Sequence, residues 1–136
     1  MHAKPSEEPR LTRNQALVLD TLSEADGPLS AYAILDLLRE NGFRAPLQVY
    51  RALDKLVAAG RVHRLESLNA FVACQKPDCR SHATIAFAIC DRCGEVREVD
   101  DPNLARRLKT IADGLDFALH GSVVELRGLC AGCAAA

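Results

Sequence analysis

The residues of this 136-residue sequence that are best suited to chemistry are its six cysteines. Four of them form two pairs of identical spacing, Cys90-x-x-Cys93 and Cys130-x-x-Cys133. Each pair can present two thiolates from one turn, and two such turns supply the four sulfur ligands of a closed tetrahedral zinc site. A redox pair of this spacing normally occurs once and beside a βαβ pattern, and neither condition is met. We therefore predict a structural zinc ion held by these four thiolates, rather than a redox centre or unrelated buried thiols.

The other two cysteines, Cys74 and Cys79, lie between two histidines in the sequence, His63 and His82. Spacing alone does not assign a second metal site to these residues, because a single histidine is more often a surface or core residue than a ligand. From the residues themselves, both a second metal ion and a set of unliganded side chains stay open.

Three helices are predicted in the first half of the chain. Thr12 and Gln15 have the spacing of a capping box, and an apolar helix to about residue 22 follows them. Ser30 can cap a second helix. A third helix would begin at Pro46 and end before Gly60, since proline favours the first helical position and glycine the end.

The third predicted helix has an apolar and a polar face. Its apolar positions recur at i, i+3, i+4 and i+7 and are Val49, Ala52, Leu53 and Leu56. Gln48, Arg51 and Lys55 fall on the other side. Two short β-prone runs follow, at 61–65 and 70–73, with a polar turn between them. This layout predicts a winged helix-turn-helix, in which the third helix enters the major groove and the hairpin lies along the DNA backbone.

The charge distribution is compatible with that prediction. The net charge of −1 excludes a basic chain that binds nucleic acid by bulk attraction. Between residues 44 and 64, however, there are five basic residues and a single acidic one, Asp54. This local excess can meet phosphates while the rest of the chain stays neutral. Alone it is weak support, because such a cluster is usually a solvated face.

The second half predicts a small domain after a linker at 74–81. An apolar run at 84–89 and a strand at 95–99 precede a helix that opens at Pro102, and a strand pair is expected over 115–129. Strands around one helix make a thin domain. We expect it to need a metal ion, a partner subunit or both for its stability.

No apolar run approaches the roughly 20 residues that a membrane helix needs. The first ten residues are polar and include Glu7 and Glu8, so we expect no signal peptide. These features favour the cytoplasm, where metal ligation explains six cysteines better than disulfides do.

Six stretches, spread in order over nearly the whole chain, resemble the ferric uptake regulator family and most closely its zinc-sensing branch. They are Leu11-Thr-Arg-Asn-Gln15, Ser30-Ala-Tyr-Ala-Ile-Leu-Asp36, Val49-Tyr-Arg-Ala-Leu53, Gly60-Arg-Val-His63, Cys90-Asp-Arg-Cys-Gly94 and Gly128-Leu-Cys-Ala-Gly-Cys133. Any one of these stretches is common, but the ordered set is specific.

The resemblance implies an α+β fold and a homodimer. It implies a winged helix-turn-helix DNA-binding domain at 1–73, a hinge at 74–82, and a small C-terminal α/β dimerisation domain with the structural zinc at 83–136. It also implies a second, regulatory zinc ion, which makes two per chain. The regulatory ligands carried over by position are His63, Cys74, His82 and Glu98, with Cys79 as a rival ligand. A thiolate among imidazoles and a carboxylate favours zinc over iron. His120 does not match a further family metal site and is interpreted as a surface residue.

The function that the resemblance implies is repression of zinc-uptake genes by a zinc-loaded dimer bound to operator DNA. The expected DNA-contacting residues are Tyr32, Gln48, Tyr50, Arg51, Lys55, Arg61 and Arg64. For Tyr32, packing within its amphipathic helix is an equally good interpretation. Arg51 is expected to recognise a guanine edge, while the wing arginines and Lys55 hold phosphates. We expect no membrane partner and no small-molecule substrate. The alternatives are a sister regulator responding to iron, nickel or peroxide, a protein-interaction adaptor, and a zinc-dependent hydrolase, although no catalytic residues are predicted.

Overall fold

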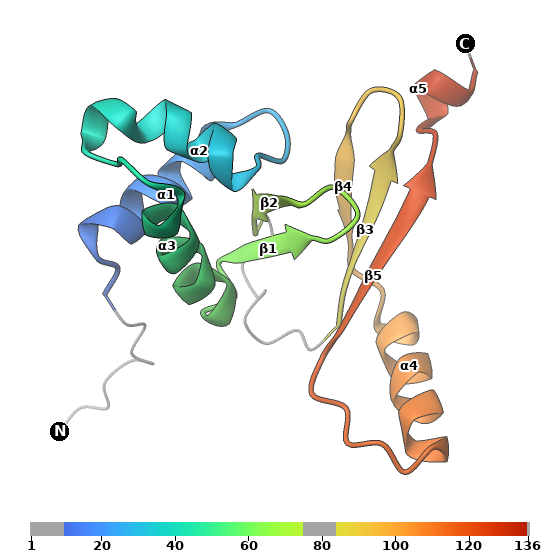
Figure 1. Cartoon of the computed structure of the whole chain (residues 1–136). Helices are drawn as coiled ribbons and strands as arrows, with labels where there is room; N and C mark the ends of the chain where they lie inside the picture. Colours follow the sequence, from blue (N-terminus) through green and yellow to red (C-terminus); the bar gives the residue numbers. More distant parts are fainter. Residues whose placement is uncertain (1–9, 75–83, 136) are drawn as a thin grey trace, which may run out of the picture.

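The computed structural model describes residues 10–74 and 84–135. Among these residues, the first half of the chain has three α-helices and a two-stranded hairpin, and the second half has a three-stranded sheet. Figure 1 shows the hairpin lying between these helices and the sheet. The structure thus has the mixed helix and sheet composition that the sequence predicts. Among the described residues, no helix combines the length and the apolar character needed to cross a membrane.

The three helices of the first half begin where the sequence predicts. Helix α1 spans Arg13–Glu24, α2 spans Ala31–Leu38 and continues into the 3-10 helix η1 (Arg39–Asn41), and α3 spans Pro46–Ala58. The capping box is present, because the Thr12 hydroxyl accepts from the Gln15 N–H and the Gln15 side chain accepts from the Thr12 N–H. The Ser30 hydroxyl caps α2. Gly42, with a φ of 97°, ends η1 in the left-handed conformation that favours glycine.

The core of the first half lies where the three helices meet the hairpin. The predicted apolar stripe of α3 is buried, and each of its four residues is at most 3% exposed. Phe43, from the turn before α3, is buried in the same cluster. The helix-turn-helix positions of the sequence are therefore confirmed as one packed unit.

The hairpin has two buried faces. Strands β1 (Val62–Leu65) and β2 (Ala70–Ala73) pair antiparallel, and alternate side chains point to opposite sides. On one side Val62 and Phe71 join the core of the helices. On the other side Leu65 joins a second cluster with Phe87 of the sheet, against which Val72 also packs. The hairpin is therefore a layer shared by the two halves of the chain.

The sheet of the second half has the strand order β4-β3-β5. Strand β3 (Thr84–Cys90) pairs antiparallel with β4 (Val96–Val99) and parallel with β5 (Ser122–Gly128). Helix α4 (Pro102–Gly114) connects β4 to β5, and the short helix α5 (Ala131–Ala134) follows the last strand.

The strand pair expected over residues 115–129 is wrong, because this segment contains the single strand β5. Leu115 ends α4, and Asp116 adopts a positive φ of 54°, which turns the backbone out of an extended conformation. Residues 115–121 therefore serve as the return connection. It lets β5 add to the sheet parallel to β3 instead of forming its own hairpin.

Candidate metal centres and nucleic-acid interface

The two Cys-x-x-Cys turns meet at one end of the sheet. Cys90 is the last residue of β3, and Cys130 is the N-cap of α5. Both turns have the same local geometry: the Cys93 N–H lies 3.4 Å from the Cys90 Sγ, and the Cys133 N–H lies 3.5 Å from the Cys130 Sγ. In each turn a backbone N–H thus points at the first sulfur of the pair.

The four sulfur atoms lie within 4.8 Å of one another. The Sγ atoms of Cys93 and Cys130 are 3.8 Å apart. A tetrahedral zinc ion with zinc–sulfur bonds of about 2.3 Å has sulfur–sulfur edges of about 3.8 Å. The spacing of these side chains therefore fits a closed four-sulfur zinc site.

The pKa values of two of these thiols, Cys90 and Cys133, are shifted in opposite directions. Backbone N–H bonds from Cys93 and Cys130 lower the pKa of Cys90 to about 6, against the opposing effect of burial. The neighbouring thiols of Cys130 and Cys90 raise the pKa of Cys133 to about 12. One thiol of the group thus ionises readily while another resists. A bound divalent cation favours ionisation of all of them, because each ligand of such a metal is a thiolate.

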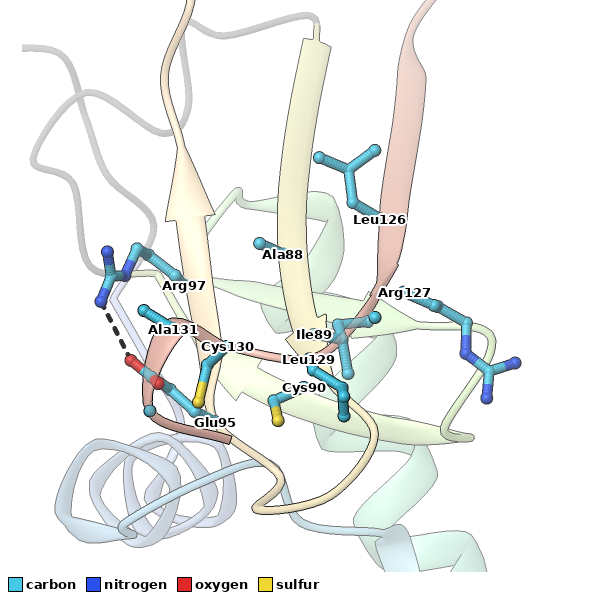
Figure 2. A pocket seen from close by; sticks show the side chains of 12 residues that line it. Ala88, Ile89, Cys90, Glu95, Arg97, Leu126, Arg127, Leu129, Cys130 and Ala131 are labelled. Carbon is cyan, nitrogen blue, oxygen red and sulfur yellow. Dashed lines mark hydrogen bonds and ion pairs between the residues drawn. The ribbon is translucent and has the colours of Figure 1, made fainter. Parts of the chain in front are cut away.

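The four-cysteine cluster borders a pocket of about 370 Å³ on the sheet. Figure 2 shows Cys90 and Cys130 beside this pocket, together with Leu126 and Leu129 and the ion pair between Arg97 and Glu95. Leu126 is 56% exposed and Leu129 is 50% exposed. The sheet therefore presents apolar surface next to the cluster.

A second cluster of metal-ligating residues lies between the hairpin and the sheet. One ligand atom each from His63, Cys74 and Glu98 lies within 4.8 Å of the others. His63 belongs to β1, Cys74 directly follows β2, and Glu98 belongs to β4. The imidazole is 8% exposed, and its ring centroid is 5.7 Å from that of Phe87. An imidazole, a cysteine sulfur and a carboxylate, which come from β1, the residue after β2, and β4, are a donor set that fits zinc when the cysteine is a thiolate.

Cys74 is disulfide-bonded in this structure. A metal-ligating Cys74 must therefore be in its reduced form, since the thiolate is the ligand. The other two residues predicted for this centre, His82 and its rival Cys79, lie outside the described residues. The structure thus brings together three of the four predicted ligands. These come from both predicted domains.

The residues expected to contact DNA lie on the helical half and the hairpin. Arg51 and Lys55 are exposed on α3, Tyr32 is 62% exposed near the start of α2, and Arg64 is exposed on β1. Arg61, just before β1, is half-buried. These positions leave each of the side chains at or near the surface.

Two of the expected contacts have a structural role as well. The Gln48 side-chain oxygen accepts hydrogen bonds from the N–H groups of Arg44 and Ala45, so it stabilises the start of α3. Tyr50 is half-buried and packs against the core of the first half. His120 is exposed, as expected for a surface residue.

One residue at the contact between the two halves was missed by the sequence analysis. Glu125 of β5 accepts hydrogen bonds from the turn of the hairpin, 58 and 59 residues away in the chain. No motif marks it, because a glutamate on an exposed-looking strand is common. Only its partners distinguish it.

A winged-helix half, a sheet half and two clusters of metal-ligating residues together define a metal-binding protein of the winged-helix class. The chain belongs to the ferric uptake regulator family, whose family model matches residues 6–127. This is a family of transcriptional regulators. The family resemblance inferred from the sequence is therefore confirmed.

Individual members of the family resemble the chain to different degrees. A zinc uptake regulation protein of Escherichia coli is 46% identical over 125 residues, which cover 91% of this chain and 72% of that protein. A ferric uptake regulation protein of Legionella pneumophila is 29% identical over 128 residues, covering 91% and 90% of the two chains.

Two solved structures are similar to this one over almost its whole length. A crystal structure of holo XcZur has a TM-score of 0.85 and 46% sequence identity, covering 93% of this chain and 88% of its own. A zinc uptake regulator complexed with zinc and DNA has a TM-score of 0.86 and 45% identity, covering 93% and 84%.

Proposed function

We propose that this chain is a zinc-responsive transcriptional repressor whose zinc-loaded homodimer binds operator DNA and represses zinc-uptake genes. The observation that carries the proposal is the cluster of His63, Cys74 and Glu98 between the wing hairpin and the sheet. The identity of 46% to a zinc uptake regulation protein, against 29% to a ferric one, supports zinc as the metal. The similar structure that contains both zinc and DNA supports the nucleic-acid partner.

The proposal includes two zinc ions per chain. Cys90, Cys93, Cys130 and Cys133 would hold the structural ion, and His63, Cys74, His82 and Glu98 the regulatory one. A regulatory site of imidazoles and a carboxylate alone would suit iron or manganese, whereas the thiolate of Cys74 shifts the preference to zinc. Zinc, when bound, supplies bonds that join its ligands across the two halves of the chain.

The regulatory ligands lie on both sides of the proposed hinge at 74–82. His63 belongs to the proposed DNA-binding domain, 1–73, and Glu98 to the proposed dimerisation domain, 83–136. Holding His63 near Glu98 restricts the angle between these domains. In a dimer that angle sets the distance between two α3 helices, which must reach major grooves about 34–36 Å apart or a multiple of that distance.

The second half carries apolar surface that a second copy of the chain would cover. Exposed apolar side chains of α4, β5 and the segments beside them are Ile111, Leu115, Phe117, Val123, Leu126 and Leu129. Exposed apolar side chains concentrated in one part of a soluble protein indicate an interaction site. We infer that it belongs to the dimer interface.

We further infer that the chain is not an enzyme and that it acts in the cytoplasm. A catalytic zinc site keeps an open coordination position, whereas the four cysteines would supply all four ligands of a bound zinc ion. Thiolate ligands need a reducing compartment, which is also where the proposed DNA partner is found.

The proposed function is tested by measuring DNA binding with and without zinc. The probe is a promoter fragment from upstream of a zinc-uptake gene, and a scrambled fragment of equal length and composition is the control. With reductant present, we expect zinc to strengthen binding to the promoter at least 100-fold and a chelator to reverse this effect. Equal binding by the chelated and the zinc-loaded protein would overturn the proposal, and activation by iron but not zinc would favour a sister regulator.

Arg51 is expected to provide sequence discrimination. It is exposed on α3, and its planar guanidinium can bind a guanine edge through two hydrogen bonds. Arg51→Ala should reduce the preference for promoter over scrambled DNA by about 10- to 100-fold, as a bidentate base contact is worth about 1–3 kcal/mol. Competition binding with the two fragments measures this ratio.

Lys55, one turn further along α3, provides the matched control. We expect Lys55→Ala to weaken binding to both fragments alike and to leave their ratio unchanged, because a phosphate contact carries no sequence information. An Arg51→Ala variant that behaved in the same way would show that Arg51 contacts phosphate only.

A further inference from the structure

The tip of the wing hairpin is attached to the sheet by one carboxylate. Glu125 of β5 accepts a hydrogen bond of 2.8 Å from the backbone N–H of Glu66 and one of 3.0 Å from the backbone N–H of Ser67. The Ser67 hydroxyl donates a third hydrogen bond to the same carboxylate. Both oxygens of Glu125 are thus engaged by the turn that joins β1 to β2.

Glu125 lies in the same row of the sheet as the candidate metal ligand Glu98. Phe87 of β3 pairs with Glu98 on one side and with Glu125 on the other. Directly paired residues of neighbouring strands point to the same face of a sheet. That face is the one against which the hairpin packs, because Phe87 is buried there with Leu65 of β1.

The hairpin is therefore attached to the sheet at two separate points. Near its base, His63 and Cys74 lie beside Glu98 of β4. At its tip, the N–H groups of Glu66 and Ser67 donate hydrogen bonds to Glu125 of β5. Strand β5 is two strands away from β4 in the sheet. At strand spacings of about 4.8 Å, the two carboxylate-bearing positions are about 10 Å apart. A rigid hairpin held at one point can still rotate about that point, whereas attachment at a second point removes the rotation.

The carboxylate of Glu125 is suited to this role in its ionised form. Burial raises its pKa, but the hydrogen bonds from Ser67 and Glu66 and the nearby Arg127 outweigh burial, so the pKa lies below its ordinary value. Hydrogen bonds to an ionised acceptor are stronger than those between neutral groups.

We propose that Glu125 is a positioning residue for DNA binding, which fixes the tip of the wing on the sheet. Because the wing is then held at its tip, a metal ion bound at its base determines the orientation of the whole DNA-binding half. This inference rests on the proposed function and adds a residue that is neither a metal ligand nor a DNA contact. The metal ligands hold the base of the wing and Glu125 holds its tip. Both attachments are needed before the position of α3 relative to the dimer is defined.

The test compares Glu125→Ala and Glu125→Gln with the unchanged chain in zinc-dependent binding to the promoter fragment. We expect Glu125→Ala to weaken binding by the zinc-loaded protein about tenfold, which corresponds to 1.4 kcal/mol. Glu125→Gln keeps one carbonyl acceptor but replaces the other oxygen with a donor, so an effect of about threefold is expected. Both variants should retain two zinc ions per chain and the dimer, measured by metal analysis and sedimentation.

The direction of this effect is diagnostic. Either substitution removes a negative charge from a protein that binds a polyanion, and the loss of that charge alone would strengthen DNA binding. Asp113→Asn, on the exposed surface of α4, removes the same charge without contacting the hairpin and is the matched control. We expect Asp113→Asn to bind the promoter as tightly as the unchanged chain or slightly more tightly.

A second readout separates positioning from a general loss of stability. This readout is the ratio of two promoter affinities, one measured with zinc in the regulatory site and one measured after that zinc has been chelated. We expect the ratio to fall about tenfold in Glu125→Ala. A variant that is merely less stable would lose affinity in both states and keep the ratio. Ser67→Ala removes one donor from the other side of the contact. Its effect should be largely absent when Glu125 is already alanine, because the effects of substituting two contacting residues are not additive.

The outcomes also separate this inference from the proposed function. Zinc-dependent promoter binding by the unchanged chain, together with an unaltered ratio in both Glu125 variants, overturns the role of Glu125 alone. Promoter binding by the unchanged chain that does not depend on zinc overturns the proposed function, and this inference with it. A lowered ratio in Glu125→Ala, an intermediate one in Glu125→Gln and no loss in Asp113→Asn support the inference.

Discussion

Replacing Cys74 by serine is expected to remove one zinc ion per chain and to abolish zinc-dependent promoter binding, while both halves of the chain stay folded. A serine hydroxyl is a hard, neutral ligand and cannot substitute for a thiolate that zinc prefers. Cys74 directly follows β2, is half-buried and does not belong to either hydrophobic cluster. With reductant present, so that its disulfide is open, its replacement by a residue of similar size should therefore cost little stability.

The size of the loss follows from the equilibrium that the metal controls. Moving a two-state arrangement from 1:99 to 99:1 requires about 5.5 kcal/mol of differential binding, or about 10⁴-fold. Losing one of four ligands should forfeit most of this difference, and we expect promoter affinity to fall at least 100-fold at saturating zinc. Metal analysis, a mobility-shift assay and circular dichroism, all under reductant, measure the zinc count, the affinity and the fold.

Cys79→Ser is the matched control for this experiment. Cys79 is the rival ligand of the regulatory site in the sequence analysis, and it lies outside the described residues. If Cys74 is the ligand, Cys79→Ser keeps two zinc ions and full promoter binding. The reverse pattern would assign the site to Cys79 and would refute the predicted role of Cys74.

Replacing Cys130 by serine is expected to unfold the second half of the chain. The described residues of this half bury only five hydrophobic side chains, whereas the first half is built on a much larger cluster. A structural zinc site contributes about 10–16 kcal/mol of binding free energy, which is comparable to the whole stability of a typical domain, about 5–15 kcal/mol. The sheet would therefore lose its main source of stability when one of its four sulfurs is removed.

The measurable consequences of Cys130→Ser differ from those of Cys74→Ser. We expect the dimer to dissociate, the β-sheet signal in circular dichroism to fall, and promoter binding to be lost at every zinc concentration. Cys74→Ser serves as the control here, because it also removes one thiolate but from the regulatory site. A Cys130→Ser chain that remained a folded dimer with two zinc ions would show that the four-cysteine cluster does not hold a structural metal.

Much of the local structure was predictable because it depends on residues close together in the chain. Thr12 and Ser30 each lie three residues before the N–H group that they cap, so a short stretch of sequence reveals both caps. The apolar stripe of α3 was visible for the same reason, since four apolar residues at i, i+3, i+4 and i+7 lie on one face over about two helical turns. The prediction of a strand pair over 115–129 was wrong because the sequence does not show that Asp116 adopts a positive φ. That turn makes the following residues a return connection instead of a strand.

The candidate metal sites were predictable to different extents. The paired spacing of four cysteines indicates a common metal without knowledge of the fold, because each Cys-x-x-Cys turn is a local unit. His63, Cys74 and Glu98 have no such spacing, and only the family resemblance suggested that they act together. Glu125 had neither a spacing pattern nor a resemblance to mark it.

The sequence by itself therefore determined the helices, the hairpin, the two cysteine turns and the family to which they point, since each is encoded by short-range periodicity, capping or spacing. The tertiary structure alone decided that the hairpin is a layer shared by both halves, and that Glu98, Phe87 and Glu125 form one row beneath it. The physical reason is strand register. It places residues far apart in the chain on one face of the sheet, and local patterns carry no information about which distant strand will pair with which.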